Sequence, residues 1–295
     1  MKRRVAYFII DGKKFGDDKN SPLNISFDVS YMGNSLVPLD ARFTIDNLSQ
    51  NDIAYITTNT SLFLDRRRKI QFWCGYEGNV RMLFDGEIEQ AQPHGKPDTS
   101  LDIRAWTSIY AMGKKIEVKS SNIKALELLR NAVLQCGYHL SCPADIQQAP
   151  QLQKMIDYFS MTGSAQEYLW RVIKDITGNY VVKDQVLFTI AKGVVTVSWA
   201  NKKNSKKNIP GIDLIENIQI NESTGMIGIP EPTQSGVNIR SKLDVSFDVG
   251  QTIDLISSMM PVYDGEYNIY GINHHGSTRS QDFYTDLICL RVMRK

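Results

Sequence analysis

The chain has 295 residues, a length that favours two compact units or one elaborated β domain. Hydrophobic residues make up 42% of it and charged residues 22%, which excludes a disordered composition and allows a buried core. Its 34 basic and 32 acidic residues leave a formal charge of +2, which excludes a general attraction to nucleic acid or to a membrane.

The first segment of the chain is predicted to be a β-strand rather than a targeting signal. Basic residues precede a short apolar run from Val5 to Ile10, but the run stops at Asp11 without a small-residue cleavage site. No segment approaches the roughly 18 apolar residues that cross a bilayer. We therefore expect no membrane insertion, and a protein made in the cytoplasm and kept there or released with a particle.

The four cysteines are scattered and form no C-x-x-C pair. This spacing suggests neither a zinc ribbon nor a dense disulfide framework. We expect reduced thiols at all four positions: Cys74, Cys136, Cys142 and Cys289.

Residues 1–115 are predicted to form an antiparallel β unit. Apolar and polar residues alternate with period two in short stretches, and Gly, Pro, Asn and Asp clusters separate them. Two of these stretches flank the turn at residues 77–79 like the strands of a hairpin. The expected strands are 5–10, 23–29, 41–45, 70–76, 80–88 and 101–106.

Residues 116–212 are predicted to form a helix-containing α/β module. Apolar residues from Ile123 to Val133 fall at helical spacing, with Asn122 as a plausible N-cap and Gly137 as the C′ glycine. The segment from Cys142 to Leu152, rich in Pro and Gln, is expected to be an exposed connection.

A second helix in this module has the clearest boundaries. Ser164 and Glu167 form an S-x-x-E capping box, an apolar stripe runs from Leu169 to Ile176, and Gly178 ends the helix. After it, residues 180–190 and 194–199 are predicted to form a hairpin around the turn Lys192-Gly193. The remaining residues, 213–295, supply further expected strands: 215–220, 237–239, 251–256, 267–272 and 283–292.

The densest group of metal-ligand side chains is Asn273-His274-His275-Gly276. Adjacent residues on a strand point to opposite faces, so the two imidazoles are not expected to share one ion. We predict one packed and one solvated histidine. His94 and His139 are isolated.

No signature of covalent chemistry occurs in the chain. Neither G-x-S-x-G nor a phosphate-binding glycine loop is present, and Thr162-Gly163-Ser164 is explained by the capping box. Asp85, Glu87 and Glu89 alternate along one strand and are expected on its solvent face. No catalytic, cofactor-binding or metal-ligating residue is therefore assigned, and no cofactor is expected.

Two basic runs and three tryptophans complete the candidate residues. The runs at 66–69 and 202–207 are short and not interleaved with aromatic residues, so we expect solvated loops or subunit contacts rather than specific nucleic-acid binding. Trp73, Trp106 and Trp170 are expected to pack in the core.

The order of several segments resembles the hub proteins of contractile phage tails, the family of the late control protein D and of the central hub of large myophage baseplates. In the C-terminal part the segments are 224–233, 236–239, 249–253, 267–276 and 283–287. In the N-terminal part they are 41–49, 75–76 and 83–88. The helical middle matches only in type.

This resemblance implies a β-rich α+β fold in which two tail-tube-like antiparallel β-barrels, residues 1–115 and 213–295, flank the module 116–212. It also implies a structural protein of the tail baseplate in the virion, not an enzyme, whose copies form a homotrimeric ring. The ring would join the sixfold tail tube, or its initiator protein, to the threefold central spike and contact other baseplate proteins. A genome would pass through its channel.

Three alternatives remain open at this stage. A tail-associated wall-degrading hydrolase would need a carboxylate pair or metal triad in a pocket. A nucleic-acid-binding module would depend on the basic runs. A hub of a tailocin or secretion machine is equally compatible with these residues. Within the hub interpretation, the strands ending at Leu48 and near Tyr284 are expected to be the edges that contact neighbouring subunits or the tube.

Overall fold

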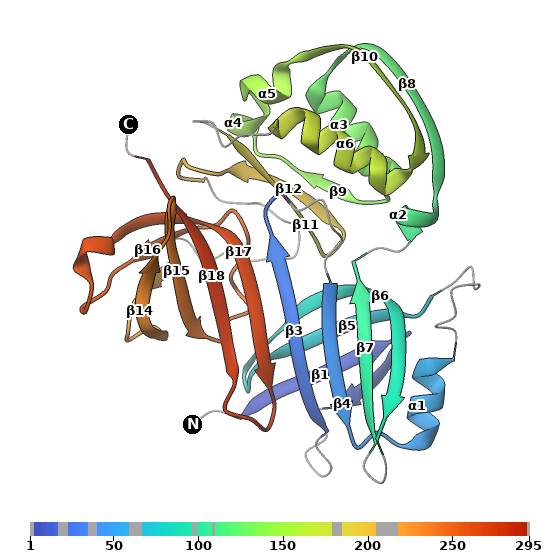
Figure 1. Ribbon diagram of the computed structural model, residues 1–295, viewed down its shortest axis with the longest axis vertical. Coiled ribbons are helices and arrows are strands. Elements are labelled where there is room, and N and C mark those ends of the chain that lie inside the picture. The colour runs from blue at the N-terminus through green and yellow to red at the C-terminus, as the bar shows by residue number, and fades with distance from the viewer. Residues whose placement is uncertain are drawn as a thin grey trace.

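The computed structural model describes residues 3–16, 23–34, 40–58, 67–95, 99–107, 110–178, 185–204 and 218–293. In them the chain is mainly β: a large, predominantly antiparallel sheet carries a smaller module that contains the long helices (Figure 1). The β-rich class predicted from the sequence is confirmed.

The N-terminal strands follow the period-two alternation of their sequence. On β3 (Asn24–Met32), for example, Ile25, Phe27 and Val29 are buried, while their polar neighbours lie on the other face. Helix α1 (Gln50–Thr57) follows β4 and begins at Ser49, whose hydroxyl accepts from the backbone N–H of Asp52. The other strands of this part are β1 (Arg4–Ile10), β2 (Lys13–Gly16), β4 (Asp40–Asp46), β5 (Lys69–Tyr76), β6 (Asn79–His94) and β7 (Ser100–Trp106).

The C-terminal strands join the same sheet. Strand β17 (Gly265–Ser277) pairs antiparallel with β3, from Gly271 opposite Met32 to Ser277 opposite Ser26. This pairing unites the two β parts in the strand order β14-β15-β18-β17-β3-β4-β7-β6-β5-β1-β2, with β16 paired to β17 and β13 to β16. The bounds are β13 (Ile218–Ile220), β14 (Met226–Pro232), β15 (Gly236–Lys242), β16 (Thr252–Leu255) and β18 (Phe283–Arg291), with a 3-10 turn, η1, at Pro261–Tyr263.

One apolar core lies inside this curved sheet and draws residues from both β parts. Four phenylalanines at its centre, Phe8, Phe27, Phe43 and Phe72, contact one another with ring centroids 4.8–5.1 Å apart. Among the described residues the backbone pairing ends at β2 and at β14, so the sheet wraps round its core without a closed ring of hydrogen bonds.

The prediction of edge strands was wrong. Strand β4, which precedes Leu48, lies between β3 and β7, and β18, which contains Tyr284, lies between β15 and β17. Alternation shows which face of a strand is buried but carries no information on its neighbours within the sheet. In the described part of the chain the main strand order ends at β2 and at β14, and its side branch ends at β13.

The middle module has its own core, formed by residues between 111 and 199. Its two main helices pack under a two-stranded antiparallel ribbon (Figure 1). The ribbon is β8 (Lys115–Lys124) and β10 (Met155–Ser164), and the helices are α3 (Ala125–Gln135) and α6 (Ala165–Thr177). The smaller elements are α2 (Tyr110–Gly113), β9 (His139–Ser141), α4 (Ala144–Gln147), α5 (Pro150–Gln153), β11 (Val186–Ala191) and β12 (Val194–Trp199).

The ribbon and helices form an internal repeat with an offset of 40 residues. Each strand passes directly into its helix, and Ala125 and Ala165 take the same buried first position. Glu127 and Glu167 follow at the same exposed position, and the buried positions of the two helices then coincide. The module is therefore built from two copies of one strand–helix unit, which the sequence analysis did not recognise.

The helix boundaries confirm some predictions and correct others. Gly137 has φ of 75° after the C-cap of α3, and the capping box of Ser164 and Glu167 is present at α6, which ends at Gly178. Asn122 is not an N-cap: it lies inside β8 with φ of 49°, and α3 begins three residues later because the ribbon continues to Lys124.

The expected exposed connection from Cys142 to Leu152 is also corrected. It folds into the short helices α4 and α5 and buries Ile146, Ala149 and Leu152 in the module core. The apolar spacing of three residues places these side chains on one side, and the prolines begin each short helix instead of breaking a longer one.

Two polar clasps attach the module to the sheet. At the end of β3, Asn34 and Phe188 of β11 exchange hydrogen bonds: Asn34 N–H donates to the Phe188 carbonyl (2.7 Å), and Phe188 N–H donates to Asn34 Oδ1 (2.8 Å). On β17 the fully buried Asn268 donates through Nδ2 to the carbonyls of Trp199 (3.1 Å) and Lys202 (2.6 Å). These contacts position the module over the junction of the two β parts.

Candidate functional site

The face of the sheet opposite the core is polar across both β parts. Cross-strand registers place one row of side chains on β18, β17, β3, β4 and β7. The row consists of Tyr284, His275, Asp28, Arg42 and Arg104, all half-buried or exposed. Because these residues alternate with buried core residues, the polar surface continues without interruption over the junction of β17 and β3.

Charges on this polar face are balanced by close pairs. The Arg240 guanidinium contacts Asp286 through two nitrogens, at 2.7 and 2.9 Å. His94 Nε2 lies 2.8 Å from an Asp102 carboxylate oxygen, and Arg104 pairs with Glu89 at 3.3 Å. The polar face therefore does not concentrate one sign of charge, unlike a nucleic-acid-binding surface.

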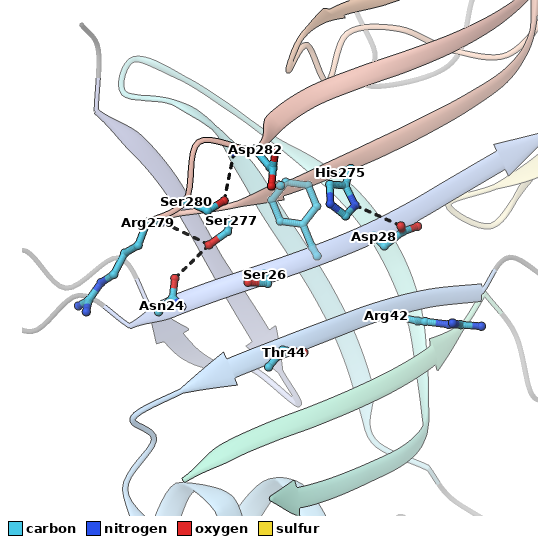
Figure 2. Close-up of a pocket in the computed structure, with 12 residues that line it drawn as sticks. Asn24, Ser26, Asp28, Arg42, Thr44, His275, Ser277, Arg279, Ser280 and Asp282 are labelled. Carbon is cyan, nitrogen blue, oxygen red and sulfur yellow. Dashed lines mark hydrogen bonds and ion pairs between the residues drawn. The ribbon is translucent and has the colours of Figure 1, made fainter. Parts of the chain in front are cut away.

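A hollow of about 620 Å³ lies on the polar face where the β17–β18 turn bends over β3 and β4 (Figure 2). In Figure 2 the side chains of Arg42 and Arg279 extend in opposite directions rather than converging. The lining is otherwise mostly small and polar: Asn24, Ser26, Phe27, Asp28, Thr44, His275, Gly276, Ser277, Ser280 and Asp282.

Arg4 of β1 holds the turn that forms one wall of this hollow. Its guanidinium donates to the carbonyls of Ser277 (3.1 Å), Ser280 and Gln281 (3.1 Å). It also lies 4.8 Å from the ring centroid of Phe283. The shape of the hollow thus depends on a contact between the first and last strands of the chain.

The two adjacent histidines have the arrangement predicted from the sequence. His274 is 1% exposed, its Nδ1 lies 2.9 Å from Thr285 Oγ1, and burial lowers its pKa to about 3. His275 is on the opposite, polar face, where its Nδ1 lies 3.2 Å from Asp28 Oδ2. The two rings therefore face different environments.

Asp28 and His275 form the carboxylate–imidazole pair that a hydrolytic triad uses, and serines lie nearby in the hollow. The hydroxyl of Ser277, however, donates to Asn24 Oδ1 at 3.1 Å and accepts from the backbone N–H of Arg279 at 3.3 Å (Figure 2). Its contacts hold the turn in place and do not direct it at the imidazole. This geometry favours a structural role for the group.

The carboxylates expected on one strand face have different partners. Strand β6 pairs with β5 in its first half and with β7 in its second, with a bulge between Ile88 and Gln90. Asp85 accordingly lies beside Gln71, and Glu89 pairs with Arg104. Burial raises the pKa of Asp85, while the hydrogen bond with Gln71 and the charge of Lys69 oppose this shift.

The basic runs are engaged within the chain where the structure describes them. Arg68 is 9% exposed, pairs with Asp11 at 2.8 Å and lies over the Tyr55 ring, so it is not the solvated loop residue that we expected. In the second run, Lys203 pairs with Glu266 at 2.6 Å. Residues 66 and 205–207 lie outside the described residues.

The prediction that three tryptophans pack in the core was wrong. Trp73 and Trp106 point away from it, because their neighbours Phe72, Cys74 and Ala105 occupy the inward positions of the alternation. Trp170 is half-buried on α6, beside the buried Leu169. Among the described tryptophans, Trp199 is the buried one.

The described residues contain no group of three His, Cys, Asp or Glu side chains arranged to hold a metal ion. In the same part of the chain, every helix is too short or too polar to cross a membrane. All four cysteines are free, and burial raises the pKa of Cys136 to about 12 and that of Cys142 to about 11.

Solved structures with the same fold are tail proteins of phages and related machines. The 43 kDa tail protein of prophage MuSo2 from Shewanella oneidensis superposes with a TM-score of 0.63 at 8% identity, covering 99% of this chain and 98% of that one. A tail protein from Neisseria meningitidis MC58 gives 0.57 at 9% identity, covering 98% and 96%. The E. coli type VI secretion component c3393, described as similar to the phage T4 proteins gp27 and gp5, gives 0.60 at 9% identity, covering 96% of this chain and 76% of that one. The chain therefore shares its fold with these proteins.

The sequence itself matches the family described as baseplate hub gp41 over residues 4–289. The chain belongs to this baseplate hub family, as the sequence resemblance implied. No curated protein is similar to it at the sequence level.

Proposed function

We propose that this chain is a non-enzymatic subunit of a phage tail baseplate whose copies close into a trimeric ring between the sixfold tail tube and the threefold central spike. Each chain has two tube-like β parts, so a ring of three chains would present six similar β surfaces to the sixfold tube. The same ring has threefold symmetry and would present three identical surfaces to the spike. The partners of this ring are further copies of the chain, the spike, the tube or its initiator, and neighbouring baseplate proteins.

The observation that best supports this proposal is the single sheet that joins the two β parts through β3 and β17. Separate domains on a linker would move independently, whereas a continuous sheet transmits force along its hydrogen bonds. A ring that connects a sixfold tube to a threefold spike and carries mechanical load needs this rigidity. The clasps at Asn34 and Asn268 add the helical module to the same rigid body.

We assign the polar face to the channel of the ring. It is continuous across strands of both β parts, and its charges are paired, as at Arg240 and Asp286. A genome carries one negative charge per phosphate, so a lining with a strong positive field would retain it, and a balanced lining lets it pass. The same face bears the hollow of Figure 2.

The test is the solution mass of the purified chain, followed by imaging. A mass near three times 33.4 kDa and ring-shaped particles with a central channel are expected. If the isolated chain is monomeric, co-expression with the spike and tube proteins of the same phage decides: failure to form a complex with them refutes the hub role.

A further inference from the structure

The curved sheet has a seam where its first strand meets the turn between β17 and β18. Strand β2 pairs with β1 only from Tyr7 to Ile10, so in the described part of the chain residues 4–6 have a backbone partner on the β5 side alone. Arg4, in this half-paired stretch, contacts the turn at residues 277–282. Segments from opposite ends of the chain therefore meet here through a side chain.

One aromatic ring fills the seam. Phe283, at the end of the turn, is 4% exposed. Its ring contacts Tyr76 of β5 at a centroid distance of 5.4 Å and Phe27 of β3 at 5.8 Å. The guanidinium of Arg4 lies over the same ring at 4.8 Å. Side chains thus close the sheet around its core at this place.

The two halves of the turn are held in different ways. At its base, Thr278 and Ile25 of β3 exchange hydrogen bonds: the Thr278 N–H donates to the Ile25 carbonyl (3.0 Å), and the Ile25 N–H donates to Thr278 Oγ1 (3.0 Å). The tip, residues 279–282, is exposed. Two of its backbone carbonyls accept from the guanidinium of Arg4 on β1. The base is fixed to one strand, and the backbone of the tip is tied to another.

Arg4 makes this contact without a counter-charge among the described residues. Its three hydrogen bonds go to neutral carbonyls, whereas Arg68, Arg104 and Arg240 pair with carboxylates at 2.7–3.3 Å. A guanidinium that binds carbonyls lacks the Coulomb attraction of an ion pair, and water replaces the carbonyls when the contact opens. The tip is therefore held by a contact that is specific in geometry yet releasable.

We infer that the tip of the turn, residues 279–282, is a flap and that Arg4 is the latch that holds it closed. In the closed state the turn forms one wall of the hollow on the polar face and shields Phe283 (Figure 2). When the latch opens, the tip moves away on its fixed base, the hollow widens and the seam becomes accessible. The latch follows from the fold alone, whereas its effect on the wall of a channel rests on the proposed function.

Trypsin cleavage after Arg279 tests the latch in the full chain, because this bond lies in the flap. Proteolysis of a segment that opens transiently follows the population of its open form. Arg4→Ala removes three hydrogen bonds of a charged group and is expected to raise the rate of cleavage at Arg279 by about tenfold or more. Mass spectrometry of the fragments identifies the site. A wild-type rate in this variant would refute the latch.

Arg3→Ala is the matched control. It makes the same change one residue earlier, where the side chain pairs with Glu77 at 3.8 Å near the surface. Such a pair contributes little, so the rate of cleavage at Arg279 is expected to stay within about twofold of the wild type. Equal acceleration in Arg3→Ala and Arg4→Ala would show that general charge loss, and not the latch, exposes the flap.

Two reference sites in the same digest separate flap opening from unfolding. Lys119 on the ribbon and Arg171 on α6 are expected to be cleaved at the wild-type rate in Arg4→Ala. If all sites accelerate together, the milder Arg4→Lys decides. Its single ammonium does not reproduce the planar fork, so selective acceleration at Arg279 is expected. A wild-type rate at Arg279, or uniform acceleration in this variant too, would refute the latch.

The digest uses the isolated chain, so its outcome is separate from that of the proposed function. Failure of the chain to bind the spike and tube proteins would refute the hub role and leave the latch standing. Unselective cleavage in both Arg4 variants would refute the latch and leave the hub role standing.

Discussion

Acid sensitivity of folding is expected to depend on His274. Its ring is enclosed by Thr285, by Tyr31 at a centroid distance of 6.3 Å, and by the rest of the core, and burial together with the charge of Lys192 lowers its pKa to about 3. In the unfolded chain the pKa is near 6.5. Between these values the unfolded state binds a proton that the folded state does not, so stability is full above about pH 6.5 and falls as the pH drops towards 3.

The slope is about 1.4 kcal/mol per pH unit, which gives a loss of roughly 2.7 kcal/mol by about pH 4.5. Urea unfolding of the wild type and of His274→Asn, at about pH 7.5 and about pH 4.5, measures it. At about pH 7.5 the variant is expected to be less stable than the wild type because it has lost packing. On acidification to about pH 4.5 its free energy of unfolding is expected to fall by roughly 2.7 kcal/mol less than that of the wild type. His275→Asn, on the half-exposed neighbour, makes the same chemical change outside the core and serves as the control variant. Parallel losses in all three proteins would refute the reasoning.

Three further changes test the architecture by urea unfolding at neutral pH. Asn268→Ala leaves buried carbonyls without donors and is expected to cost about 2–4 kcal/mol, whereas Asn273→Ala, on the polar face of the same strand, is expected to cost under about 1 kcal/mol. Ser164→Ala removes the cap of α6 and is expected to lower the free energy of unfolding by about 1 kcal/mol. An unchanged free energy of unfolding would show that the capping box does not stabilise the helix. Gly33→Ala places a Cβ against the Leu187 side chain and is expected to cost about 1–3 kcal/mol, which a Leu187→Ala partner change should partly recover.

Local signals account for the successful predictions. Strand β3 was expected from the alternation of Ile25, Phe27 and Val29, and helix α6 from the box of Ser164 and Glu167, because both patterns depend on residues close in sequence. The ribbon strand β8 was missed although Ile116 and Val118 alternate with charged neighbours there. The helical spacing that follows it masked this weaker signal.

The candidate site was less accessible to prediction. The assignment of Trp73 to the core relied on residue type, but the parity of the strand places it outward beside Tyr7. Arg68 was interpreted as part of a solvated run, but the fold brings Asp11 and Tyr55 to it from other segments. The direction of Trp73 could have been read from the alternation of its neighbours, whereas the partners of Arg68 come from segments far away in the sequence.

Residue periodicity predicted the β-rich class, with short amphipathic strands and two helices, and the resemblance of several segments implied a baseplate hub. The tertiary structure decided how the strands join. The pairing of β17 with β3 and the positions of β2 and β14 at the ends of the strand order arise from contacts between residues far apart in the chain. The alternation within a strand determines which of its side chains are buried. The order of the strands depends on which strand edges pair and which faces pack together in the complete fold.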